Sequence, residues 1–248
     1  MKNAQSFQKA ILIIATILLT TQIQAQSWFG NKVKGNGKVT TISRTTGDYD
    51  AIACVGSMDF ILVEGQEGKI TIEGEENLLE HIITEVKNNT LTVKVENGVD
   101  LRESHNKTIK ITIPFKNIDK VSLTGSGDIW NTDTITETNL EVSLTGSGDI
   151  VLDIKTNNVA GSVTGSGDVT LKGKTINLEA SVTGSGDFNG NNLQAENTEV
   201  SVRGSGDADV YSTETLRARV SGSGDIEYKG NPKKEDTKVA GSGSISGN

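Results

Sequence analysis

The sequence predicts an all-β protein whose chain winds into a single-stranded parallel β-helix, or β-solenoid, with coils of about 20 residues and no significant helix. Three observations lead to this fold class. The tetrapeptide Gly-Ser-Gly-Asp recurs along the second half of the chain at nearly constant intervals. Apolar residues keep fixed positions around it, and they alternate with polar residues as in short strands.

The first 25 residues are predicted to be a secretory signal peptide. Lys2 and Lys9 precede the apolar run AILIIATILL, and the small-residue exit IQA|QS places cleavage after Ala25. The run is shorter than the roughly 20 apolar residues of a bilayer span, and no later segment reaches that length. We therefore expect an exported chain that is not transmembrane, located in the periplasm, at the cell surface or outside the cell. Residues 26–38 are interpreted as a short leader.

Charge and cysteine content narrow the possible functions. The net charge is −8, and removal of residues 1–25 takes away two lysines and no acids, which gives −10. So acidic a chain is a poor binder of nucleic acid. Cys54 is the only cysteine, so no internal disulfide can form, and the fold must depend on its core and its hydrogen bonds.

The repeat is read from the aspartate that ends each Gly-Ser-Gly-Asp. These reference residues are Asp128, Asp149, Asp168, Asp187, Asp207 and Asp225, followed by Ser244. Five residues before them stand Leu123, Leu144, Val163, Val182, Val202, Val220 and Val239. One residue after them stand Ile129, Ile150, Val169, Phe188, Ala208, Ile226 and Ile245. Because no coil can bury these side chains alone, successive coils are expected to stack with like residues above one another.

The N-terminal half shows a weaker version of the same pattern. Asp59 follows Gly56-Ser57-Met58, which places Cys54 in the apolar column and predicts a buried, unreactive thiol. The segments KITIEG, NTLTVKV and KTIKITIP keep strand alternation. The spacing from Asp59 to Ser244 predicts about ten coils, within a single solenoid domain over residues 39–248.

The order of these segments resembles a known family. The stretch YDAIACVGSMDFILVEGQEGKITIEGEENLLEHIITEVKNNTLTVKV, a strand ending in ITIP, and serial SGSGDI motifs resemble the head GIN domain of auto-transporter adhesins over about residues 45–231. This is a bacterial family first catalogued as a domain of unknown function. The resemblance implies an exported β-helix protein that acts at the cell surface. It supplies no catalytic or ligand-binding residues to carry over.

The repeated aspartates are the sequence's main candidate for chemistry. A phosphate cradle is disfavoured because strands, not helices, follow the glycines. Stacked aspartates about 4.8 Å apart repel by about 0.9 kcal/mol per pair even in water, so backbone N–H groups or cations must offset the charge. We expect each aspartate to accept hydrogen bonds from its own turn. Calcium binding by Asp128, Asp149, Asp168, Asp187, Asp207 and Asp225 is the weaker alternative, since Ser244 would be a poor ligand.

A second regular feature is a surface ladder of hydroxyl side chains just before each turn. Its members are Ser122, Thr124, Ser143, Thr145, Ser162, Thr164, Ser181 and Thr183, and Arg203 interrupts it. Such a face could bind a glycan or ice, but serine and threonine are also ordinary residues on the solvent side of strands. A solvated face is the preferred interpretation.

The sequence favours a binding role over catalysis. His81 and His105 lie in the irregular half, with neither metal-ligand spacing nor a nucleophile motif beside them. We therefore expect a non-catalytic surface or envelope module, adhesin-like or structural, without a cofactor. Its surface ligand, a glycan or a protein, is not identified by the sequence. A carbohydrate-active β-helix enzyme is the alternative function.

Both ends of a solenoid expose strand edges. Trp28 and Phe29 could cover the first coil, and we expect the last coil either to fray or to self-associate with a second copy.

Overall fold

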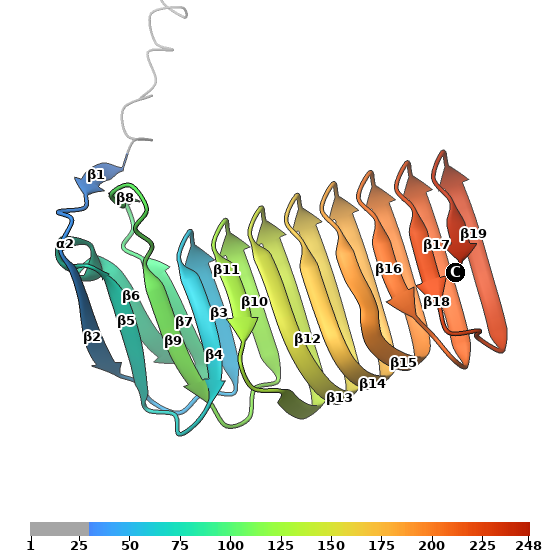
Figure 1. Ribbon diagram of the computed structural model, residues 1–248, viewed down its shortest axis with the longest axis horizontal. Helices are drawn as coiled ribbons and strands as arrows, with labels where there is room; N and C mark the ends of the chain where they lie inside the picture. The colour runs from blue at the N-terminus through green and yellow to red at the C-terminus, as the bar shows by residue number, and fades with distance from the viewer. Residues whose placement is uncertain (1–29) are drawn as a thin grey trace, which may run out of the picture.

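Each coil of the repeat consists of two strands that meet at the Gly-Ser-Gly turn and face each other across the core. The computed structural model describes residues 30–248, so the predicted signal peptide, Trp28 and Phe29 lie outside the described residues. Strands make up 69% and helix 2%, and parallel coils of about 19 residues form a β-solenoid of about 7 turns. Figure 1 shows these coils side by side along the long axis. The predicted fold class is confirmed.

The strands before and after the turn form two separate faces. In the first and last repeats a coil has two separate strands, whereas the strands of the middle repeats run round the far corner and belong to both faces. The repeat strands are β10 (Lys120–Gly125), β11 (Asp128–Asn131), β12 (Ile135–Gly146), β13 (Asp149–Gly165), β14 (Val169–Gly184), β15 (Phe188–Gly204), β16 (Ala208–Tyr211), β17 (Thr215–Gly222), β18 (Ile226–Lys229), β19 (Lys234–Gly241) and β20 (Ile245–Gly247). We call the side that leads into the turn the pre-turn face and the side that leaves it the post-turn face.

Parallel pairing in register builds both faces. On the pre-turn face the order is β3, β10, β12, β13, β14, β15, β17 and β19. On the post-turn face it is β4, β11, β13, β14, β15, β16, β18 and β20. The two predicted apolar columns lie between the faces and are buried from Leu123 to Val220 and from Ile129 to Ile226. Only in the last coil do they reach solvent, where Val239 is 41% exposed.

The turn itself is stacked as tightly as the strands. The first glycine takes a positive φ, which is +125° at Gly165. The amides of Ser166 and Gly167 both donate to the carbonyl oxygen of Gly146 in the preceding coil, at 2.9 and 3.1 Å. The backbones of neighbouring turns are therefore in direct contact.

The N-terminal end departs from the predicted serial winding. β3 (Ala51–Gly56) and β4 (Asp59–Glu64) form the first coil, and Cys54 is buried there as predicted. The next strands do not continue toward the C-terminal coils. Instead β7 (Thr90–Val95) and β9 (Lys110–Phe115) pair with β3 and β4 on the side opposite to β10 and β11. β6 (Ile82–Lys87) and β5 (Lys69–Glu75) pair antiparallel to β7 and β9, and β2 (Val39–Thr45) pairs antiparallel to β5.

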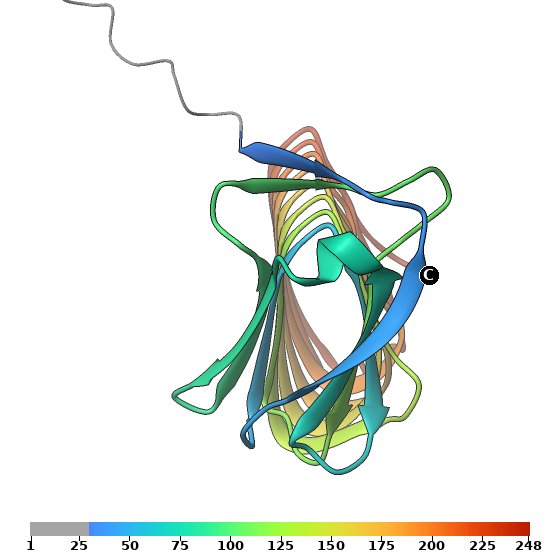
Figure 2. The same cartoon turned by 90° about the vertical axis from the view of Figure 1, so that its left-hand side faces the viewer.

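The prediction of about ten coils is therefore wrong, because residues 65–119 form a cap of mixed strand direction. The cap covers the edge that a plain solenoid would expose. A short helix, α2 (Glu76–Leu79), and a separate pair of strands, β1 (Asn31–Lys34) with β8 (Val99–Arg102), complete it. Figure 2 views this end directly. Within the predicted leader, β1 is thus an ordered strand. Among the residues described, no helix is long and apolar enough to cross a membrane.

One buried carboxylate holds the cap together. Glu75 is 1% exposed and accepts hydrogen bonds from the N–H of Gly37 at 2.5 Å and from the N–H and hydroxyl of Ser104, each at 2.7 Å. Burial alone would raise the pKa of Glu75, but the hydrogen bonds from Ser104 and Gly37 outweigh it and lower that pKa overall. The charged carboxylate thus links the N-terminal strands to the loop after β8.

The C-terminal coil is regular. β19 and β20 pair along their length with β17 and β18, so the frayed end that we expected is not observed. Two inward positions of β19 are polar, because Glu235 lies over Leu216 and Thr237 over Ala218. Glu235 accepts a hydrogen bond from Tyr228 Oη at 3.0 Å. An inward charge of this kind protects a sheet edge against further pairing.

Candidate functional site

The six candidate calcium ligands form one exposed column at the start of the post-turn face. Each carboxylate accepts a hydrogen bond from the backbone N–H one coil further on, at 2.6–3.1 Å, from Asp149 onto Asp128 through to Ser244 onto Asp225. The prediction that each aspartate binds its own turn is wrong. The amides of the turn already donate to the preceding coil, so the free donor is the N–H of the next reference residue.

The carboxylates form a row rather than a metal-binding cluster. No group of three or more His, Cys, Asp or Glu side chains within residues 30–248 is placed to hold a metal ion. A hollow of about 350 Å³ does lie beside Asp168, Asp187, Asp207 and Asp225, and Asp209 and Glu227 also line it. Burial and the charge of Glu227 raise the pKa of Asp209. The acids follow the coil spacing and do not converge on one point.

A substitution at Asp187 separates the hydrogen-bond role from a calcium role. Asp187 Oδ1 accepts the N–H of Asp207 at 2.8 Å. Asp187→Asn keeps an acceptor and removes repulsion within the column, so we expect stability within about 0.5 kcal/mol of wild type. Asp187→Ala should cost about 1 kcal/mol, because the N–H of Asp207 is left to water. Urea unfolding with and without calcium measures both. A calcium-dependent gain in the wild type that Asp187→Asn abolishes would contradict this assignment.

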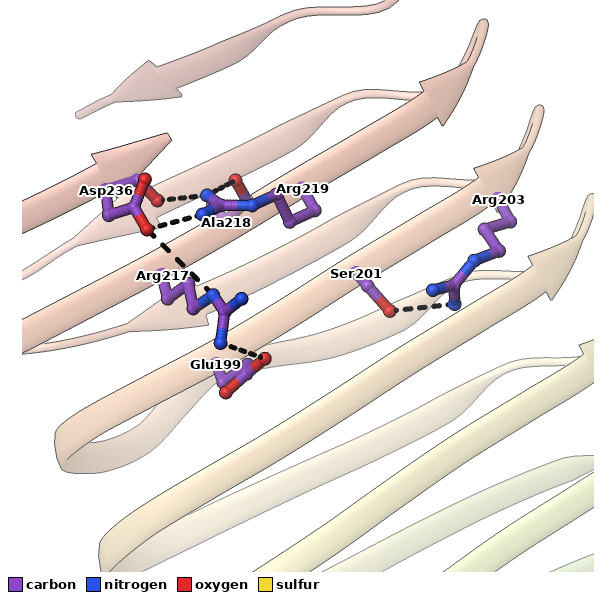
Figure 3. Close-up of polar contacts among 7 residues, drawn as sticks. All are labelled: Glu199, Ser201, Arg203, Arg217, Ala218, Arg219 and Asp236. Atoms are coloured by element: carbon purple, nitrogen blue, oxygen red, sulfur yellow. Dashed lines mark hydrogen bonds and ion pairs between the residues drawn. The ribbon is translucent and has the colours of Figure 1, made fainter. Parts of the chain in front are cut away.

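The hydroxyl ladder lies on the pre-turn face, where its serines are half-buried and its threonines exposed. Arg203 takes the threonine position in the fifth row, and its Nη1 lies 3.3 Å from Ser201 Oγ (Figure 3). The row is regular, and none of its residues lines the hollow beside the aspartates.

A second, larger hollow lies on the pre-turn face, further from the turn than the hydroxyl ladder, and we call it the axial groove. It measures about 910 Å³ and crosses successive coils from Lys120 to Arg217. Three rows of side chains line it. The amide row is Asn139, Asn158, Asn177 and Asn197; the floor row is Leu140, Val159, Leu178 and Thr198; and the wall row is Glu141, Ala160, Glu179 and Glu199.

The amide row is a continuous hydrogen-bonded ladder. Nδ2 of Asn158 donates to Asn139 Oδ1 at 2.7 Å, Nδ2 of Asn177 to Asn158 Oδ1 at 2.7 Å, and Nδ2 of Asn197 to Asn177 Oδ1 at 3.0 Å. An amide has two N–H donors and two lone pairs on its oxygen. Asn158 and Asn177 thus each keep one donor and one acceptor for a ligand.

The wall row is closed by an ion pair at each end. Lys120 Nζ lies 2.7 Å from Glu141 Oε1, and Arg217 Nη1 lies 3.2 Å from Glu199 Oε1. Figure 3 shows Arg217 between Glu199 and Asp236, and Arg219 of the same strand also contacts Asp236. Between the two pairs stand Ala160 and Glu179. Ala160 leaves a gap in the wall, and no described residue forms an ion pair with Glu179.

The axial groove was missed by the sequence analysis, although the sequence contains a signal for it. Asparagine stands ten residues before each of Asp149, Asp168, Asp187 and Asp207. The histidines are elsewhere: His81 Nδ1 lies 3.2 Å from Glu96 Oε2 in the cap, and His105 is in the loop after β8. The residues that line the groove include neither histidine nor cysteine.

Comparisons with known proteins agree with this architecture. The family model described as "Putative auto-transporter adhesin, head GIN domain" matches residues 48–232. A "putative adhesin" from Bacteroides fragilis has a TM-score of 0.81 and 26% identity, and the match covers 87% of this chain and all (100%) of that one. A "Putative lipid binding protein" from Parabacteroides distasonis has a TM-score of 0.73 and 28% identity, with 88% and 100% covered. No curated protein matches the chain.

Proposed function

Because the chain belongs to the head GIN domain family of "putative auto-transporter adhesins", we propose that it is an exported, non-catalytic binding module of the cell surface or envelope. Export rests on the signal peptide features of residues 1–25, with cleavage after Ala25. The observation that carries the binding role is the axial groove, because a repeated set of side chains along a rod offers an extended surface to a long ligand.

The layout of the acids supports a binding role over the carbohydrate-active alternative. Glycosidases place two carboxyl groups on either side of the bond that they cleave. In the axial groove Glu141, Glu179 and Glu199 lie in line on one wall, and the opposite row consists of amides. The fourth acid, Asp119, lies at the end of the groove next to Lys120. We therefore propose no catalytic role and no cofactor.

A lipid ligand, which the description of one structural neighbour would suggest, fits this groove poorly. An acyl chain needs apolar walls as well as an apolar floor. Here only the floor is apolar, and Leu140, Val159 and Leu178 are at most 3% exposed.

A variant that fills the groove tests the proposed function. Ala160 is exposed on the wall, so Ala160→Trp adds bulk to the groove without entering the core. We expect fluorescent beads coated with residues 26–248 to bind a panel of intact bacterial and epithelial cells, and Ala160→Trp to reduce that binding at least tenfold. The matched control is Thr164→Trp, which is exposed on the same strand but outside the groove. Equal binding by both tryptophan variants, or no binding to any cell, would contradict the proposal.

A further inference from the structure

We propose that the ligand of the axial groove is an extended polysaccharide without acidic groups, whose successive sugars lie over successive coils. This inference rests on the proposed function and names the class of ligand. Three properties of the groove lead to it: the repeat of its hydrogen-bonding groups, the complete pairing of the strands beneath it and the sign of its charge.

The amide row fits a chain of hydroxyl groups. Each sugar hydroxyl both donates and accepts hydrogen bonds, and Asn158 and Asn177 each present one free N–H and one free lone pair. These pairs repeat at the strand spacing of about 4.8 Å. An extended peptide repeats every 3.3 Å or so and alternates its side chains, so it would lose register with the coils. A chain of linked sugar rings has a longer repeat and hydroxyl groups on every unit.

The pairing of the sheet also argues against a peptide strand. Extended peptides usually bind by adding a strand to a free sheet edge. The strands beneath the groove are β12, β13, β14 and β15, and each is already paired on both sides. A ligand there must bind side chains, and the asparagine and glutamate side chains on either side of the buried floor supply hydrogen-bonding groups.

The charge of the wall row excludes an acidic polymer. Lys120 and Arg217 are both occupied by Glu141 and Glu199, which leaves Glu179 as an unpaired carboxylate beside the gap at Ala160. An anionic chain would meet Glu179 on a protein whose net charge without residues 1–25 is already −10. The Glu179 carboxylate would instead accept a hydrogen bond from a sugar hydroxyl or from the ammonium group of an amino sugar.

An oligosaccharide array tests the ligand class. The probes are cello-oligosaccharides, chitosan oligomers and oligogalacturonates of two, four and six sugars, applied to residues 26–248. We expect binding of the neutral or amino series, with at least a tenfold gain from two to four sugars because four asparagines line the groove. Oligogalacturonates of equal length should bind at least tenfold more weakly. Asn158→Ala and Asn177→Ala should each weaken binding about five- to tenfold, whereas Thr183→Ala, outside the groove, should not.

The cell assay separates this inference from the proposed function. Periodate, which cleaves sugar diols, should abolish cell binding, and protease treatment of the cells should not. If Ala160→Trp blocks cell binding but periodate has no effect and the array shows no ligand, the module binds a protein and the polysaccharide inference is overturned. Preference for the acidic series, or affinity that does not depend on length, would overturn it equally. If Ala160→Trp binds cells like wild type, both proposals fail.

Discussion

Replacing Gly167 by alanine is expected to destabilise the fold by roughly 3–4 kcal/mol, although the substitution adds only one methyl group, at a buried position in the turn of the solenoid. The Cβ atom would lie 2.0 Å from the carbonyl oxygen of Gly148 in the preceding coil. That oxygen is backbone and cannot move alone, because the Gly148 amide is held by Gly125 and the Gly167 amide by Gly146. The coils would have to separate at the turn, and their core columns would separate with them.

Two other glycines separate the cost of a positive φ from the cost of a steric clash between neighbouring turns. Gly98 has a φ of +80° and open space at its Cβ, so Gly98→Ala should cost only the conformational penalty of about 1–2 kcal/mol. Gly165 combines a φ of +125° with a Cβ position 2.3 Å from Gly146 O. Gly165→Ala should therefore lower the stability at least as much as Gly167→Ala. Urea unfolding followed by circular dichroism gives the three values. A Gly167→Ala loss no larger than that of Gly98→Ala would show that neighbouring turns are not in contact.

The same stacking explains why the repeat region could be predicted from sequence. When each coil lies on the previous one in register, a buried position such as Leu144 must be followed one coil later by another apolar residue, here Val163. The column is therefore visible without any structure. The cap has no such constraint, because β5 and β6 run antiparallel to β9 and β7, and their partners do not share a repeat position.

The axial groove could not be predicted from the sequence repeat in the same way. The asparagine column is in the sequence, but a column of polar residues indicates only that the position faces solvent. Whether Asn158 stands beside a hollow depends on how the chain bends round the far corner between Ile154 and Asn158. The partner of each aspartate was missed for a related reason, since the preceding coil already occupies the amides of Ser166 and Gly167.

A second large effect is expected at Gly161, where the neighbouring coils carry Val142 and Ala180 at the same position. Gly161 is small because a Cβ there would lie 2.5 Å from Cε2 of Phe188, the largest side chain in the column one residue after the turn. Gly161→Val should therefore cost about 3 kcal/mol through overpacking. Phe188→Val alone should cost about 2 kcal/mol, because it leaves a cavity in the core.

The double variant Gly161→Val/Phe188→Val should recover most of the combined loss, since the added valine occupies space that the phenylalanine ring vacates. We expect its stability within about 2 kcal/mol of wild type, which corresponds to a coupling of about 3 kcal/mol in a double-mutant cycle. Gly47 offers a matched control, because its Cβ would lie 4.0 Å from Val86, an ordinary contact. Gly47→Val combined with Phe188→Val should be additive. If the losses at Gly161 and Phe188 are additive instead, the two positions pack independently. The small residue at 161 would then not compensate for the large side chain at 188.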